Sequence, residues 1–205
     1  KLDAAKLEEE MRGLSERAMR LIGLAVTDKS LEEENALPSE LTLVGVFGLR
    51  DEIRKESLPA VETARKAGIQ VVMITGDAKD TAQAIAREVG ILETEKGLIL
   101  TSTQLGEFSD QEIKNILPDL RVVARALPTD KSRLVKLAKS MDWVVGMTGD
   151  GVNDAPAVKN ADVGFSMGNG TDMTKESSDI VILDNNFNSL TNAVRYGRTL
   201  LKSIR

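Results

Sequence analysis

The sequence predicts an α/β fold, a doubly wound parallel sheet, preceded by a partial antiparallel α+β segment. From residue 57 onward, short apolar runs alternate with amphipathic helices, which is the pattern of repeated βα units. A turn rich in Gly and Asp follows one of these runs at residues 148–156, and open parallel sheets bind ligands at such turns. Residues 1–50 differ, because two apolar runs joined by a polar loop indicate an antiparallel pair.

The first fifty residues are interpreted as the end of one domain. A charged, helical start precedes the first apolar run, and the polar loop contains Pro38. The charged segment at residues 50–55 follows the second run and is interpreted as a hinge. The expected strands are residues 21–26 and 41–47, and the expected loop is residues 35–39.

The middle of the chain alternates helix and strand. Ser57 can cap a helix that has Pro59 in its first turn and ends at Gly68. Ser109 and Glu112 form a capping box that starts another helix. The remaining expected elements are a buried parallel strand at 69–74, a helix with Ala82, Ile85, Ala86 and Val89 on one face and Gly90 at its end, and a strand at 120–124.

The last third continues the same alternation. A helix is expected at residues 129–141, and Pro156 starts another. A basic helix at residues 189–205 completes the chain. Further strands are expected at 143–147, 162–165 and 180–183.

Composition limits the chemistry. The 205 residues are 41% hydrophobic and 29% charged, as in globular domains, and only 3% are aromatic, so the core must be aliphatic. The absence of Cys excludes disulfides and thiolate sites, and the absence of His excludes imidazole ligands, so any metal must be held by oxygen. A net charge of −5 argues against a nucleic-acid partner. The chain begins at Lys1, and we expect it to be part of a longer protein.

The segment Thr148 to Pro156 carries the strongest chemical signal. Asp150, Asn153 and Asp154 place two carboxylates and one amide in a loop that leads from a strand into a helix. Such oxygens suit Mg²⁺, which usually brings phosphate with it, so the segment predicts Mg²⁺-assisted phosphoryl chemistry. The alternatives are a Gly/Asp/Asn turn, and Asp154 as merely the N-cap of the following helix.

Two other positions fit phosphate chemistry. Lys131 follows Pro128 near a helix start, where its ammonium and the backbone N–H groups can offset negative charge, although a solvated lysine is the alternative. Thr75, Gly76 and Asp77 end a strand, and Thr75 and Gly76 can donate to a phosphoryl oxygen. The alternative there is a turn in which Asp77 caps the next helix.

These residues resemble the motifs of P-type ATPases, cation pumps that form an aspartyl-phosphate. The resemblance covers residues 17–205, and blocks at 171–179 and 184–187 are similar to the type II pumps, calcium pumps first. The matching segments, in the family's order, are Thr75-Gly76-Asp77, Ala124 to Lys131, Thr148 to Pro156, and Gly164 to Gly168 with Gly170-Thr171-Asp172.

The resemblance implies a domain division. Residues 1–50 would be the C-terminal part of a nucleotide-binding domain, and residues 51–187 a haloacid-dehalogenase-like phosphorylation domain. Residues 188–205 would be a stalk helix leading to a membrane through helices outside this chain, unless that basic helix is only a solvated surface helix.

The resemblance also implies residue roles. Asp150 would hold Mg²⁺, Lys131, Thr75 and Gly76 would stabilise the phosphoryl group, and Asn153 and Asp154 would orient its oxygens. Arg20, Arg54, Asp77 and Arg125 would contact ATP. From the residues alone, Arg125 could instead form an ion pair at the rim of the site, and Arg20 and Arg54 could be exposed structural residues.

The implied parent is an ATP-driven cation pump whose catalytic unit lies on the cytosolic face of a membrane. This chain lacks the Asp-Lys-Thr-Gly-Thr segment that carries the family's nucleophile, so we expect it to be inactive alone. Glu52 and Ile53 replace two prolines before the hinge arginine, and Ser166 replaces a small apolar residue. The alternatives are a soluble haloacid-dehalogenase-type phosphatase and a non-catalytic phosphate-binding module.

Overall fold

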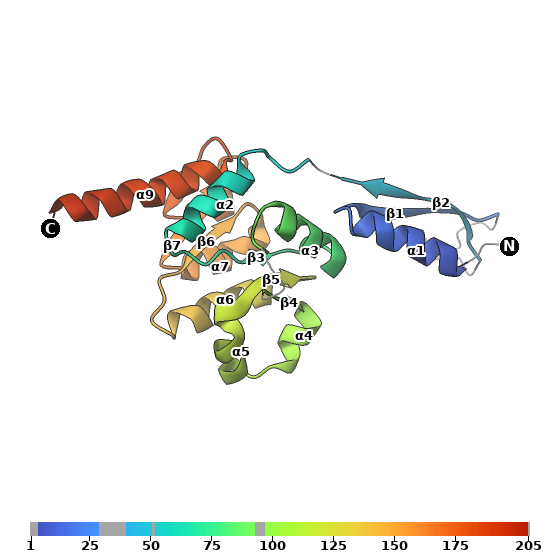
Figure 1. The fold of residues 1–205 in the computed structure, drawn as a ribbon, viewed down its shortest axis with the longest axis horizontal. Coiled ribbons are helices and arrows are strands. Elements are labelled where there is room, and N and C mark those ends of the chain that lie inside the picture. Colours follow the sequence, from blue (N-terminus) through green and yellow to red (C-terminus); the bar gives the residue numbers. More distant parts are fainter. Residues whose placement is uncertain (1–3, 29–39, 51, 93–96, 205) are drawn as a thin grey trace.

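The computed structural model describes residues 4–28, 40–50, 52–92 and 97–204. Figure 1 shows a central α/β body, with an antiparallel unit projecting from one side and a long helix from the other. The predicted α/β class is confirmed. The parallel strands, however, lie in two sheets of three strands rather than in one continuous sheet.

The projecting unit contains the predicted antiparallel pair. Helix α1 (Ala4–Ser15) packs on β1 (Arg20–Val26), which pairs antiparallel with β2 (Thr42–Leu49). The loop expected at 35–39 lies outside the described residues. The two strands expose a group of apolar side chains, namely Ile22, Leu24, Val26, Phe47 and Leu49.

The first parallel sheet is built around β5 (Leu120–Ala124), which pairs with β3 (Met73–Ile74) on one side and β4 (Leu98–Thr101) on the other. Both faces of β5 are buried, as a central parallel strand requires. The helices of this half are α2 (Ser57–Lys66), α3 (Lys79–Glu88), α4 (Ser102–Glu107), α5 (Asp110–Ile116) and α6 (Pro128–Lys139), with the 3₁₀ turn Leu117–Asp119 before β5.

The second parallel sheet has the order β6-β7-β8. Its strands are β6 (Gly146–Gly149), β7 (Val163–Met167) and β8 (Ile180–Ile182). The 3₁₀ turn Val152–Asp154 leads into α7 (Ala155–Asn160), α8 (Asp172–Glu176) lies between β7 and β8, and α9 (Phe187–Ile204) ends the described chain.

Aliphatic clusters hold the layers together, as the scarcity of aromatic residues requires. On one face of the first sheet, Leu120 and Val123 pack with residues of α4, α5 and α6. On the other face, Val122 and Ala124 pack with residues of α2 and α3. Because β5 contributes to both clusters, removing one of its larger side chains should open a cavity in the centre of the domain.

Several sequence predictions need correction. Ser57 does not cap α2, because Glu56 before it already has helical backbone angles and the Ser57 N–H donates to the Arg54 carbonyl. The strand expected at 69–74 is limited to β3, whose only partner among the described residues is β5. Just before it, the Gln70 side chain donates to the Leu117 and Leu120 carbonyls.

One other strand boundary differs from expectation, and two elements were not predicted. The strand expected at 143–147 begins only at Gly146, because the Val145 backbone bonds to Asp162 and Val163 in the turn before β7. Neither β4 nor α4 was predicted from the sequence. A capping box between Thr101 and Gln104 starts α4, and this Thr-x-x-Gln spacing was a usable signal.

Among the residues placed by the structure, no helix is both long and apolar enough to span a bilayer. Helix α9 contacts α2, its early residue Leu190 is buried with Phe165 and Ile182 of the second sheet, and its later residues Leu200, Leu201 and Ile204 are exposed.

We expect Leu120→Ala to lower the free energy of unfolding by about 2–5 kcal/mol, because Leu120, the first residue of β5, is 0% exposed and its loss leaves a cavity. Leu183→Ala is the matched control, since Leu183 is 84% exposed and its truncation should change stability by less than about 0.5 kcal/mol. Urea unfolding at 25 °C measures both. Equal effects of the two substitutions would contradict the assigned core.

Candidate functional site

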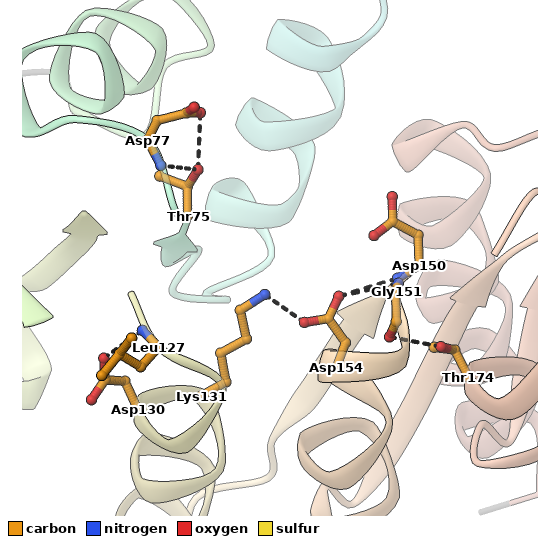
Figure 2. Close-up of polar contacts among 9 residues, drawn as sticks. All are labelled: Thr75, Asp77, Leu127, Asp130, Lys131, Asp150, Gly151, Asp154 and Thr174. Carbon is orange, nitrogen blue, oxygen red and sulfur yellow. Dashed lines mark hydrogen bonds and ion pairs between the residues drawn. The ribbon is translucent and has the colours of Figure 1, made fainter. Parts of the chain in front are cut away.

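Most of the predicted site residues lie in the segments that follow the carboxyl ends of parallel strands. Thr75 to Asp77 follow β3, Arg125 and Lys131 follow β5, and Asp150 to Asp154 follow β6. Figure 2 shows the Lys131 side chain extending toward Asp154 across the space between the two sheets. This is the edge at which open parallel sheets bind ligands.

A short ion pair links the two halves of the site. Lys131 Nζ on α6 lies 2.5 Å from Asp154 Oδ1, and the two side chains are only 20% and 9% exposed. Water is largely excluded, so each charge depends on the other for compensation. The predicted phosphate-binding lysine is therefore held by a carboxylate from the second sheet.

Asp154 also organises its own loop. Its Oδ2 accepts the N–H groups of Asp150 at 3.3 Å and Gly151 at 3.4 Å. Although Asp154 immediately precedes α7, its carboxylate does not cap that helix. Gly149 makes this arrangement possible, because a Cβ there would lie 2.5 Å from Asp154 Cβ. The cap alternative for Asp154 is thus wrong, and the carboxylate instead folds the loop back on itself.

Residues of helix α8 and its N-cap donate hydrogen bonds to the backbone carbonyls of the same loop. Thr174 Oγ1 donates to the Gly151 carbonyl at 2.8 Å and lies 2.8 Å from Thr171 Oγ1, while the Thr171 N–H donates to the Asp150 carbonyl at 2.9 Å. Thr174 is not among the site residues predicted from the sequence. No local pattern indicates it, because the contact joins residues far apart in the chain.

The Asp150 carboxylate and the Asn153 amide project from this loop and are exposed. In the described part of the chain, neither side chain has a hydrogen-bond or ion-pair partner, and no group of three carboxylates is placed to hold a metal. Mg²⁺ commonly binds proteins through one or two carboxylates and completes its shell with water and phosphate. A loop with one accessible carboxylate fits that mode, and Asp150 is the residue that would hold the ion.

Thr75 and Asp77 form a second polar cluster. Thr75 Oγ1 donates to Asp77 Oδ2 at 3.0 Å and accepts the Asp77 N–H, while Arg20 Nη2 lies 2.5 Å from Asp77 Oδ1. Partial burial raises the pKa of Asp77, but the hydrogen bonds from Arg20 and Thr75 outweigh it, so the pKa is lowered. Asp77 does not cap α3, whose N-cap position is Ala78.

Gly76 lies between these residues with its surroundings open. A Cβ at Gly76 would meet no atom within 4 Å, so the peptide stays accessible from that side. The Thr75 hydroxyl is already donated to Asp77, whereas the sequence analysis predicted donation to a phosphoryl oxygen.

Arg125 shapes this cluster mainly through its backbone. It has a φ of 53°, which is uncommon for a residue with a side chain. In this conformation its N–H donates to the Asp77 carbonyl at 2.9 Å, and the next N–H, of Ala126, donates to the Thr75 carbonyl at 2.9 Å. The exposed Arg125 side chain also adds positive charge near Asp77.

Arg54 lies elsewhere. Its guanidinium donates to the Asn185 carbonyl after β8, and no described contact joins it to Arg20 or Asp77. The Ser189 hydroxyl and, to a smaller degree, the Arg54 charge lower the pKa of Asp184 in the same loop. The predicted nucleotide residues thus form one group of three, Arg20, Asp77 and Arg125, with Arg54 apart from them.

Comparison with protein families defines the class. Two models described as haloacid dehalogenase-like hydrolase match residues 4–162 and 133–194. The first match covers more than half of the chain, so the chain belongs to the haloacid dehalogenase-like hydrolase family.

The curated relatives confirm the resemblance predicted from the motifs. The chain is 45% identical over 98% of its length to calcium-transporting ATPase PAT1 of Dictyostelium discoideum, and 40% identical over 98% to a calcium-transporting ATPase of Bacillus subtilis. It spans only 18% and 23% of those two proteins. A crystal structure of a zinc-transporting PIB-type ATPase in the E2.Pi state matches 99% of this chain with 26% of its own, at a TM-score of 0.67 and 24% identity, which supports the fold.

Replacing Lys131 by Met should lower the free energy of unfolding by about 3 kcal/mol, because the buried Asp154 carboxylate loses its compensating charge. Adding Asp154→Asn should recover part of this loss, giving a coupling energy of at least about 1 kcal/mol in a double-mutant cycle measured by urea unfolding.

Lys139→Met provides the matched control. Lys139 pairs with Asp162 at 3.1 Å, but the two side chains are 38% and 35% exposed, so this loss should lower the free energy of unfolding much less than the loss of Lys131 does. Strictly additive effects of the Lys131 and Asp154 substitutions would contradict the pairing.

Asp77 should make stability depend on pH in a defined window. Its pKa is lower in the folded chain than in the unfolded chain, so its ionisation favours folding above about pH 4 and this contribution is lost as pH falls further. The free energy of unfolding of wild type minus that of Asp77→Asn should therefore stay constant from pH 7 to 5 and decrease below pH 4. Urea unfolding at each pH measures it, and a difference that stays constant to pH 3 would show that Asp77 gains no such stabilisation.

Proposed function

We propose that this chain is part of the catalytic unit of an ATP-driven cation pump of the P-type class, with calcium as the transported ion. The observation that carries the proposal is the convergence of Lys131, Asp150 and Asp154 at the carboxyl ends of two parallel sheets. The identity to calcium-transporting ATPases over nearly the whole chain supports the choice of ion.

Each site residue has a separate role in phosphoryl transfer. Asp150 presents its carboxylate for Mg²⁺, and the bound ion would neutralise charge on the transferring phosphoryl group. Lys131 supplies a fixed positive charge, and the Gly76 peptide offers an N–H from an open loop. Asn153 is exposed beside Asp150 and can orient phosphoryl oxygens, while Asp154 fixes both the lysine and the loop.

ATP would approach through the second cluster. Arg20, Asp77 and Arg125 bring two guanidinium groups to the end of β3, where they can meet the charged phosphates and ribose of the nucleotide. Because Arg20 belongs to the antiparallel unit and Asp77 to the parallel sheet, nucleotide bound there would contact both parts. Arg54 lies apart from this cluster, where it binds the Asn185 carbonyl after β8.

The remaining assignments follow from the same proposal. Residues 1–50 belong to the nucleotide-binding domain, residues 51–187 to the phosphorylation domain, and α9 lies in the stalk at residues 188–205. The unit lies on the cytosolic face of the membrane, and helices elsewhere in the longer protein carry the ion. The phosphorylated aspartate also lies elsewhere, because this sequence has no Asp-Lys-Thr-Gly-Thr segment.

The decisive experiment uses the longest natural protein that contains this chain. The protein is incubated with γ-labelled ATP and Mg²⁺ over a panel of cations and quenched in acid. We expect calcium-dependent label that hydroxylamine releases, because an acyl-phosphate is cleaved by that reagent. Lys131→Ala should lower the rate of labelling by about 100-fold or more, since it removes charge stabilisation at the reacting phosphate.

Lys159→Ala is the control, because Lys159 is exposed at the end of α7 and should leave labelling unchanged. Label that appears with a cation other than calcium would support an ATP-driven pump but identify that cation as the transported ion. Absence of acyl-phosphate with every cation would reject ATP-driven transport in favour of a phosphatase or a phosphate-binding module.

A further inference from the structure

All four backbone polar groups of the Asp150–Gly151 dipeptide have partners. Asp154 Oδ2 accepts both N–H groups, the Thr171 N–H binds the Asp150 carbonyl, and the Thr174 hydroxyl binds the Gly151 carbonyl. The backbone that carries Asp150 is therefore fixed from two sides, and only its side chain projects freely. Of the four contacts, the bond from Thr174 is the only one that depends on a side-chain hydroxyl.

The hydrogen bonds of the two threonines have a defined direction. Thr174 has a single hydroxyl proton, which it donates to the Gly151 carbonyl at 2.8 Å. In the 2.8 Å contact between the two hydroxyls, Thr171 must therefore be the donor and Thr174 the acceptor. Thr174 is 0% exposed, so water cannot replace its hydroxyl on the carbonyl.

The turn before α8 packs closely against the loop. A Cβ at Gly170 would lie 2.9 Å from the Met167 carbonyl oxygen and 3.3 Å from Asp150 Cα, so the turn before α8 is pressed against the Asp150 backbone. A change in the Thr174 contact must then be absorbed by rotation of the peptide between Gly151 and Val152, which lies on the far side of Gly151 from Asp150.

We propose that Thr174 is a positioning residue for divalent-cation binding by Asp150. Its hydroxyl sets the orientation of the Gly151–Val152 peptide and, through the backbone of Gly151, the direction in which the Asp150 carboxylate projects. Groups that orient a metal ligand without touching the metal typically change affinity by 10–100-fold when removed. This inference rests on the proposed function, specifically on Asp150 as the residue that holds the ion.

The test measures ion binding directly on the 205-residue chain. Mn²⁺ is the probe, because it prefers the same oxygen ligands and broadens the NMR signals of nearby amides. In ¹H–¹⁵N spectra we expect the Gly151 and Val152 amides to broaden at lower Mn²⁺ concentrations than amides remote from the loop. Thr174→Val should require about tenfold more Mn²⁺ for the same broadening, and Thr174→Ser, which keeps the hydroxyl, should match wild type.

Thr191→Val is the matched control. Thr191 is also buried, and its hydroxyl also donates to a backbone carbonyl at 2.8 Å, that of Asn188 in α9, so the substitution removes a similar bond away from the loop. It should leave the Mn²⁺ titration unchanged. If Thr174→Val fails to fold, as judged by loss of amide dispersion, Thr174→Ala removes the same hydroxyl and carries the same expectation.

A wild-type titration curve in Thr174→Val would overturn the proposal, as would equal weakening in the Val and Ser variants, since the hydroxyl would then not be responsible. Asp150→Asn separates this failure from that of the proposed function. If the loop amides of Asp150→Asn still respond to Mn²⁺ as in wild type, Asp150 does not hold the ion, and both proposals fail on that ground.

Discussion

The Asp154 carboxylate is the constraint on which the arrangement of this site depends. One oxygen binds Lys131 from the helix that follows the first sheet, and the other accepts two N–H groups of the loop that follows the second. Because the two parallel sheets share no strand pairing, this carboxylate joins their functional ends directly. The close approach at Gly149 and the buried position of Asp154 both serve that junction.

A second junction joins the antiparallel unit to the first sheet. Arg20 meets Asp77, the Thr81 hydroxyl donates to the Met19 carbonyl, and Arg50 pairs with Glu88 on α3. These contacts are mostly polar and partly exposed, unlike the aliphatic packing inside the α/β body. Contacts of this kind are individually weak, so this junction can separate and reform while the body stays folded.

The features that depend on local sequence patterns could be predicted. Hydrophobic periodicity located most of the helices and β5, and motif spacing identified the three loops of the site. Contacts between residues that are distant in the sequence could not be predicted in this way. The dual role of Asp154, the reach of Thr174 across the loop and the separation of Arg54 from Arg20 all join residues distant in the chain. Strand β3 is also shorter than predicted, because it lies at the edge of its sheet and pairs on one side only, although residues 69–74 have a typical strand composition.

The division into two sheets has a consequence for how this chain behaves in solution. Strands β3 and β6 each end a sheet, and among the described residues neither has a neighbour on its outer side. An unpaired strand edge is a template for pairing with another chain. The exposed apolar side chains of β1 and β2 form a second surface that can associate with another molecule. The isolated polypeptide should therefore self-associate as its concentration rises, and a separately supplied peptide strand that pairs with these edges would act as a solubilising partner.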